Sequence, residues 1–296
     1  MFSKKAHKVK NCLFAIGVIG LLMVMPVVTG PQPPTLDAPS FILLDPETGE
    51  VLYGKNINDI RAPASTTKIM TALLSIEMGD PTDLVKVSQT ADDEHGASLG
   101  IVEGEEIPLD DMTYATLVKS GNDGAVAIAE HIGGSVANFA EIMNRRASEL
   151  GMKDSFFVNP NGMPDSPLDR HNSSAFDLAI LAREAMKHPE FQNYVSSPEV
   201  HFDRFGDRED VTFESTNKLL KEFPLCNGIK TGYTDRAGFC LVASATYRDK
   251  TLIAVVLGCE RDCQWMQARE LFDYGFMLYD PDYSEFSALY DNNSVF

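Results

Sequence analysis

Residues 63–72 read Pro-Ala-Ser-Thr-Thr-Lys-Ile-Met-Thr-Ala, and this stretch gives the strongest indication of fold and chemistry in the 296-residue chain. Ser65 and Lys68 fit the pattern Ser-x-x-Lys, and the apolar residues that follow recur at helical spacing. Proline close to a helix start is common. Ser65 is therefore predicted in a first helical turn, near free N–H groups and partial positive charge. Lys68, three residues later, lies on the same helix face and can reach the Ser65 hydroxyl.

A serine hydroxyl is a poor nucleophile unless a neighbouring base takes its proton. A lysine can act as that base only when it is neutral, which requires burial or a nearby cation. Taken alone, however, this pair also fits a structural interpretation. Ser65 would then cap the helix and Lys68 would be a solvated helix residue, so the chemical interpretation depends on partners elsewhere in the chain.

Two further motifs follow in order. Ser120-Gly-Asn122 fits Ser-x-Asn, and Lys230-Thr-Gly232 fits Lys-Thr-Gly, where Lys230 would supply the required cation. A second Ser-x-x-Lys match at residues 215–218 is not followed by the other motifs in order and is interpreted as a loop. Residues 96–100 match the Gly-x-Ser-x-Gly nucleophile elbow, but neither a buried strand before Ser98 nor a helix after it is indicated.

Hydrophobic patterning outward from these motifs predicts strands at both ends of the chain and helices between them. The predicted strands cover residues 40–44, 51–53, 228–232, 238–246 and 251–257. Signals from Ser65 to about Val195 are mostly helical, a polar connection follows, and residues 264–277 predict a last helix. The fold class is therefore α+β: one antiparallel sheet formed from both chain ends, with a large helical insertion.

The N-terminus resembles an export signal, because four lysines precede an uncharged apolar run from Leu13 to Val28. Both a cleaved signal and a retained membrane anchor fit residues 1–30. Either places the folded part outside the cytoplasm, secreted or tethered to the membrane. Residues 31–39 predict a Pro-rich spacer. Residues 40–279 then form the predicted catalytic domain, and 280–296 a tail.

The net charge of −18 becomes −22 once residues 1–30 are set aside, since the remainder holds 21 basic and 43 acidic residues. This balance excludes nucleic acid as a partner. No common zinc, phosphate-loop or dinucleotide motif occurs, so neither metal nor cofactor is predicted. His171 is the one histidine that we connect with the active-site neighbourhood. Four cysteines lie on the exported side, and Cys226–Cys240 is the first choice for a disulfide, with free buried thiols as the alternative.

With these motifs in place, the chain resembles the low-molecular-mass penicillin-binding proteins, and among them the serine-type D-alanyl-D-alanine carboxypeptidases. The resemblance runs from about Ser40 to Phe276 and includes Asn159-Pro-Asn-Gly162, His171-Asn-Ser-Ser-Ala175 and Asp273-Tyr-Gly-Phe276. It implies the penicillin-binding/β-lactamase-type fold. It also implies removal of terminal D-alanine from peptidoglycan stem peptides that end in D-Ala-D-Ala, and covalent inhibition by β-lactam antibiotics.

The resemblance assigns the following roles. Ser65 forms the acyl-enzyme with Lys68 as its base, and Ser120 and Asn122 relay protons and hold the substrate amide. The predicted substrate-binding residues are Lys230, Thr231, Gly232, Tyr233, Thr234 and Arg261. Lys230 and Thr231 would bind the terminal carboxylate, and the N–H groups of Ser65 and Tyr233 would form the oxyanion hole.

The chain departs from the family at two points. The given sequence ends at Phe296, so we expect no β-rich second domain and no C-terminal amphipathic anchor of the kind found in many members, and this expectation favours a retained N-terminal anchor. Gln264 stands where some members place a carboxylate-binding arginine, and Arg261 is the nearest candidate. Two alternatives stay open: a β-lactamase or esterase with the same fold, and a catalytically idle peptidoglycan-binding protein.

Overall fold

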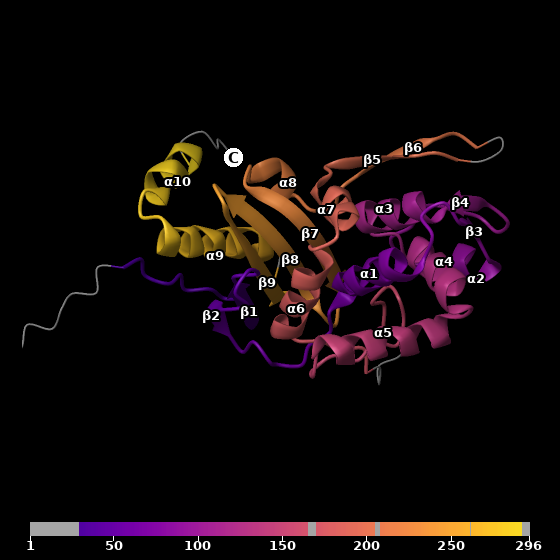
Figure 1. Ribbon diagram of the computed structural model, residues 1–296, viewed down its shortest axis with the longest axis horizontal. Helices are drawn as coiled ribbons and strands as arrows, with labels where there is room; N and C mark the ends of the chain where they lie inside the picture. The colour runs from indigo at the N-terminus through magenta and orange to yellow at the C-terminus, as the bar shows by residue number, and fades with distance from the viewer. Residues whose placement is uncertain (1–29, 165–169, 205–207, 261, 292–296) are drawn as a thin grey trace, which may run out of the picture. The chain divides into compact units, whose positions relative to one another are not determined.

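The central sheet holds five antiparallel strands in the order β2-β1-β9-β8-β7, so its members come from both ends of the chain (Figure 1). The strands are β1 Ser40–Leu44, β2 Val51–Lys55, β7 Cys226–Thr234, β8 Gly238–Tyr247 and β9 Lys250–Cys259. The computed structural model describes residues 30–164, 170–204, 208–260 and 262–291. The predicted export segment, residues 1–29, and Arg261 lie outside these described residues. The predicted α+β sheet is confirmed.

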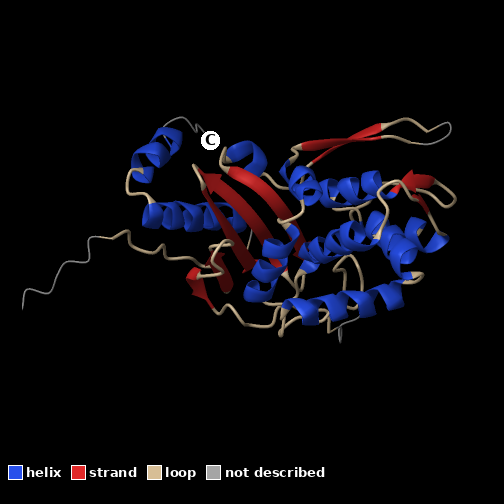
Figure 2. Ribbon diagram, viewed as in Figure 1, coloured by secondary structure: helices blue, strands red, loops and turns tan. Residues whose placement is uncertain are grey.

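Both faces of the sheet are covered by helices (Figure 2). Successive strand residues point to opposite faces, and in β9 the residues on both faces are buried in a core. Ile253 and Val255 join the core with α1 (Lys68–Met78) and α6 (Ala175–Ala185). Leu252 and Ala254 join the core with α9 (Cys263–Tyr279). Burial on both faces explains why β8 and β9 have continuous apolar sequences.

The insertion between β2 and β7 is mostly helical, as predicted. It contains η1 Ala64–Thr67, α1, α2 Gln89–Asp92, α3 Leu109–Lys119, α4 Asn122–Gly133, α5 Val136–Leu150, α6, α7 Pro189–Ser196 and α8 Leu219–Glu222. Two small antiparallel strand pairs were not predicted from the sequence. These are β3 (Leu84–Lys86) with β4 (Glu106–Pro108), and β5 (Glu199–Phe202) with β6 (Val211–Glu214).

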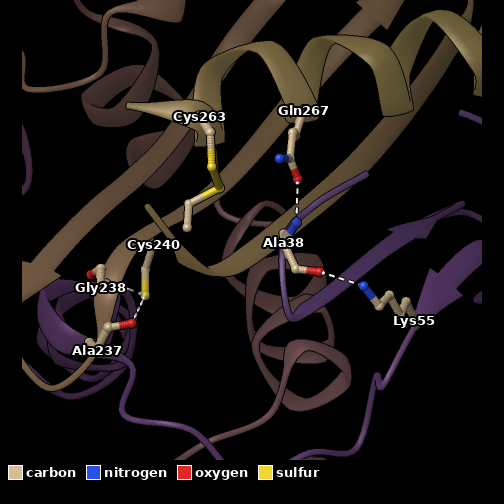
Figure 3. The surroundings of a disulfide bond; sticks show 8 residues. Ala38, Lys55, Ala237, Gly238, Cys240, Cys263 and Gln267 are labelled. Carbon is tan, nitrogen blue, oxygen red and sulfur yellow. Dashed lines mark hydrogen bonds between the residues drawn. A yellow bond between two sulfur atoms is a disulfide. The ribbon is translucent and has the colours of Figure 1, made fainter. Parts of the chain in front are cut away.

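The predicted Cys226–Cys240 disulfide is wrong, because Cys259 is bonded to Cys263 and the other two thiols are free. Within the β7–β8 pair, Cys226 lies opposite Ala245, five residues along β8 from Cys240. Five strand residues span about 17 Å, too far for a disulfide. Figure 3 shows Cys263 in its disulfide at the start of α9, while the Cys240 sulfur faces the carbonyls of Ala237 and Gly238.

The predicted last helix, residues 264–277, corresponds to α9. A further helix, α10 (Tyr283–Asp291), lies in the segment expected as a tail, where Tyr283 is buried against the α9 side of the sheet. Over the part of the chain that the structure describes, no helix has both the length and the apolar character needed to cross a membrane.

Candidate active site

Ser65 lies on η1, the short 3₁₀ turn that leads directly into α1. The side chain is half-buried, whereas Lys68, the first residue of α1, is completely buried. Lys68 Nζ lies 3.0 Å from Ser65 Oγ. The predicted contact between the two is therefore present, although Ser65 occupies a 3₁₀ turn rather than the first turn of the α-helix itself.

The Lys68 amine has three oxygen neighbours. Besides Ser65 Oγ, it donates to Asn122 Oδ1 over 2.7 Å and to the Asn161 carbonyl over 3.0 Å. A charged ammonium has three N–H donors, whereas a neutral amine has two and one lone pair. In the neutral state, bonds to Asn122 and Asn161 would use both N–H groups. The lone pair would then face the Ser65 hydroxyl, as a base must.

Ser120 lies between α3 and α4, and Asn122 is the first residue of α4. Ser120 has a left-handed backbone (φ 70°), which is uncommon outside glycine and turns the chain sharply between the helices. Asn122 is buried at the start of α4, where its Nδ2 donates to the His95 carbonyl over 2.6 Å. The amide is thus fixed with its oxygen toward Lys68.

Asp123, next in sequence, fixes the loop beside this motif. Its carboxylate accepts from the Ser98 hydroxyl and from the N–H groups of Leu99, Gly100 and Gly124. Ser98, the serine of the Gly-x-Ser-x-Gly match, is therefore a partner of a carboxylate in a loop. The second Ser-x-x-Lys match, residues 215–218, also lies in a loop.

Lys230, Thr231 and Gly232 lie on β7, the edge strand beside η1. Lys230 is buried, and its amine donates to the Thr231 carbonyl over 3.2 Å. A Cβ atom at Gly232 would lie 2.9 Å from the backbone nitrogen of Ser65, so only glycine lets β7 approach η1 this closely. The Thr231 hydroxyl is 2.7 Å from the Thr216 hydroxyl.

The last three predicted substrate-binding residues are less closely joined to this group. Tyr233 is half exposed, and its hydroxyl donates to Asp235 over 2.9 Å. The Thr234 hydroxyl accepts from Ala237 N within the β7–β8 turn. Arg261 lies outside the described residues.

Burial controls the charge of both lysines. Burial, followed by the positive charge of Lys230, lowers the pKa of Lys68 well below its ordinary value, while Asp123 and Glu94 oppose this change. Burial also lowers the pKa of Lys230 to about 7. Burial therefore favours the neutral amine of both lysines, the charge of Lys230 adds to this effect at Lys68, and Lys230 keeps a charge at mildly acidic pH.

Sequence reasoning missed two contacts of this site. Asn161 lies in the segment quoted for the family resemblance, but nothing in the sequence indicated that its carbonyl contacts Lys68. Glu94 accepts from Asn161 Nδ2 over 3.1 Å. His171, connected with this neighbourhood from sequence, is buried with its Nε2 2.8 Å from the Thr67 hydroxyl, two residues from Ser65.

One group of three potential metal ligands occurs among the described residues. His201, Asp203 and Asp210 have ligand atoms within 4.8 Å of one another, but all three are exposed. They belong to the β5–β6 region and none is a motif residue, so this group adds nothing to the serine and lysine site.

With this geometry established, comparison with known families decides the classification. The family model described as D-alanyl-D-alanine carboxypeptidase matches residues 27–261. The chain belongs to this carboxypeptidase family. The predicted penicillin-binding-type fold is also confirmed, since penicillin-binding protein 6B from Escherichia coli superposes with a TM-score of 0.76 at 34% identity. That match covers 84% of this chain and 80% of the other.

Two relatives in the carboxypeptidase family show how far the similarity extends. The carboxypeptidase DacF of Bacillus subtilis is 38% identical over 82% of this chain and 63% of its own length. DacB2 of Mycobacterium tuberculosis is 31% identical, over 86% of this chain and 85% of its own length. The chain thus spans less than two thirds of DacF.

Proposed function

We propose that this chain is a serine-type D-Ala-D-Ala carboxypeptidase that acts through an acyl-enzyme on Ser65. The observation that carries the proposal is the arrangement around Lys68. Its amine is buried, has a lowered pKa and lies 3.0 Å from Ser65 Oγ, with oxygen acceptors for its two remaining N–H groups. This arrangement supports a neutral lysine as the base that activates a serine nucleophile.

In the proposed reaction, Ser65 Oγ attacks the carbonyl of the penultimate D-alanine while Lys68 takes the hydroxyl proton. The backbone N–H groups of Ser65 and Tyr233 stabilise the negative oxygen of the tetrahedral intermediate. The C–N bond then breaks, and terminal D-alanine leaves with a proton relayed through Lys68 and Ser120. Water hydrolyses the resulting ester and restores the Ser65 hydroxyl.

The terminal carboxylate is proposed to bind beside β7. Lys230 supplies a positive charge at mildly acidic pH, and Thr231 supplies a hydroxyl, with the hydroxyl of Thr216 next to it. Gly232 keeps the strand edge open to the substrate, and Asn122 holds the substrate amide. Because β-lactams mimic the D-Ala-D-Ala terminus, they are proposed to acylate Ser65 and to deacylate slowly.

The proposed site of action is outside the cytoplasm, on stem peptides of peptidoglycan. Residues 40–279 would form the catalytic domain, while residues 1–30 would direct export and either be removed or remain as a membrane anchor. The acidic composition of the folded part agrees with a partner other than nucleic acid.

The direct test is release of D-alanine from diacetyl-Lys-D-Ala-D-Ala, with Ser65→Ala as the inactive control. We expect the wild-type protein to release one D-alanine per peptide and the variant to release none above background. Folded wild-type protein that releases no D-alanine would overturn the proposed activity. Rapid turnover of penicillin would instead favour a β-lactamase.

A further inference from the structure

Two consecutive residues hold the two oxygen acceptors that Lys68 has besides the Ser65 hydroxyl. Glu94 and His95 follow α2 in a loop that belongs to none of the three motifs. The His95 carbonyl accepts from Asn122 Nδ2 over 2.6 Å, and the Glu94 carboxylate accepts from Asn161 Nδ2 over 3.1 Å. Asn122 Oδ1 and the Asn161 carbonyl are in turn the acceptors of Lys68.

The two acceptors come from separate segments of the chain. Asn122 begins α4, whereas Asn161 lies in the segment after α5, far away in the chain. A primary amine rotates freely about its last bond, so its lone pair is aimed only when both N–H groups are held. The loop therefore joins the two segments whose alignment decides where that lone pair points.

Glu94 also contributes a negative charge. The charged groups that act on Lys68 are Lys230 from β7, Asp123 from α4 and Glu94 from the loop. The Asp123 carboxylate is occupied by four hydrogen-bond donors and is buried. Glu94 is half-buried, and its carboxylate accepts a side-chain hydrogen bond from Asn161, so fewer donors surround its charge than surround that of Asp123.

We propose that Glu94 is a positioning residue for Lys68: its carboxylate orients Asn161, and its charge balances Lys230 across the Lys68 amine. This inference rests on the proposed function of Lys68 as the base for Ser65. Glu94 acts through Asn161 and takes no proton from substrate. It favours the protonated lysine that forms when Ser65 attacks, while the held acceptors keep the neutral amine aimed at Ser65.

Two substitutions separate the charge from the hydrogen bond. Glu94→Gln keeps an acceptor oxygen for Asn161 but removes the charge, so the pKa of Lys68 should fall further. The acid limb of the acylation profile then moves to lower pH by about half a unit to one unit, with a plateau within about twofold of wild type. Glu94→Ala also removes the acceptor. The plateau acylation rate of this variant should fall about tenfold, and the loss should appear in kcat rather than in KM.

The matched control is Glu103→Gln, the same change on an exposed residue of the same loop. Acylation by a fluorescent penicillin is followed for all four proteins between pH 4 and 9, after circular dichroism has confirmed their fold. The Glu103→Gln profile should overlay that of wild type. A Glu94→Gln profile that also overlays wild type, or a Glu94→Ala plateau equal to that of wild type, would overturn the inference.

A second measurement does not depend on turnover. The ¹³Cε resonance of Lys68, assigned by its loss in Lys68→Ala, is titrated in ¹³C-lysine-labelled wild type and Glu94→Gln. We expect its midpoint to move to lower pH in the variant, and equal midpoints would refute the role of Glu94. If wild type is not acylated at all, the proposed function fails, while this titration still decides the electrostatic claim.

Discussion

At the scale of single residues, the proposed roles of Lys68 and Lys230 require one neutral and one charged amine. In the proposed reaction, Lys68 must be neutral to take a proton from Ser65, whereas Lys230 must be charged to hold a carboxylate. Burial lowers the pKa of both, but the charge of Lys230 lowers the pKa of Lys68 further. The proposed working state of the pair is reached when one proton has left, and the charge of Lys230 favours loss of that proton from Lys68.

Replacing Lys230 with methionine should have two effects on activity. Loss of its charge raises the pKa of Lys68, so the acid limb of the acylation profile moves to higher pH. Loss of the cation also raises KM for the D-Ala-D-Ala peptide by about tenfold or more. Steady-state kinetics and penicillin acylation across pH measure both, and an unchanged KM would contradict the carboxylate role.

The same variant should be more stable than wild type at neutral pH. The pKa of Lys230 is about 7 in the folded protein, whereas the ordinary value for a lysine, which applies to the unfolded chain, is 10.5. The folded state thus binds fewer protons between these values, so stability falls as the pH drops from 10.5 to 7, and the full cost remains below 7. Lys230→Met removes this cost, and calorimetry at pH 7 should show a melting temperature several degrees higher.

The motif residues of the site could be predicted from sequence because their spacing is local. Ser65 and Lys68 are three residues apart on one helix face, and Ser120 and Lys230 each lie within a short motif of their own. Glu94 and Asn161 could not be predicted, since they meet only after the loop beyond α2 and the segment beyond α5 fold together. Hydrophobic periodicity carries no information about such a contact.

At the scale of elements, hydrogen bonds and an ion pair join the β5–β6 hairpin to the loop that carries Glu94. Arg204 donates to the Leu99 and Gly100 carbonyls and forms an ion pair with Glu105 at 3.2 Å. The Arg204 and Glu105 side chains are only 3% and 7% exposed. Arg208 reaches the same carboxylate at 2.8 Å but is 38% exposed.

Removal of Arg204 should therefore destabilise this corner of the molecule. Arg204→Met leaves Glu105 without its buried partner, and we expect a loss of about 3 kcal/mol or more in the free energy of unfolding. Acylation should also slow, because the loop loses an anchor. Arg208→Met, the exposed control, should cost less than about 1 kcal/mol. Urea unfolding compares the two, and equal losses would refute the difference.

The β5–β6 hairpin was not predicted from the sequence. Its strands have four residues each, and the segment around them is polar, so it was interpreted as a connection. Strands β3 and β4 have three residues each, too short for an alternation to be seen. The long strands β8 and β9 were predicted because their sequences are mostly apolar, and the structure shows that most residues of each are buried.

The Cys259–Cys263 disulfide joins the end of β9 to the start of α9. It closes a loop of five residues, so its removal should cost about 2 kcal/mol in the chain-entropy account. Urea unfolding of Cys259→Ser/Cys263→Ser against wild type measures this. Peptide mapping without reduction should find Cys226 and Cys240 alkylated by iodoacetamide and the other pair protected. A Cys226–Cys240 cross-link would contradict the structure.

At the scale of the whole molecule, Asp45 connects three regions of the chain. Its buried carboxylate accepts from Lys250 Nζ over 2.6 Å and from the Tyr279 hydroxyl over 2.9 Å. Burial alone would raise the pKa of Asp45, but these hydrogen bonds, with one from the Glu47 backbone, hold it at about 2. The turns of the β1–β2 and β8–β9 hairpins and the end of α9 are thereby joined.

Asp45→Asn should lower the free energy of unfolding at pH 7 by about 2 kcal/mol. The pKa is lower in the folded state, so this stability is present above the ordinary value of 3.8 and is lost as the pH falls toward 2. Urea unfolding of both proteins should give curves that converge over this range. A difference that stays constant down to pH 2 would contradict the assignment.

The central claim is that Ser65 is the acylated nucleophile. Its most direct test is mass spectrometry of the intact protein after incubation with penicillin, followed by peptide mapping. We expect one penicilloyl adduct per chain, on the peptide that contains Ser65, and none in Ser65→Ala. A folded protein that gains no adduct, or one that carries it on Ser98, Ser120 or Ser215, would contradict the account.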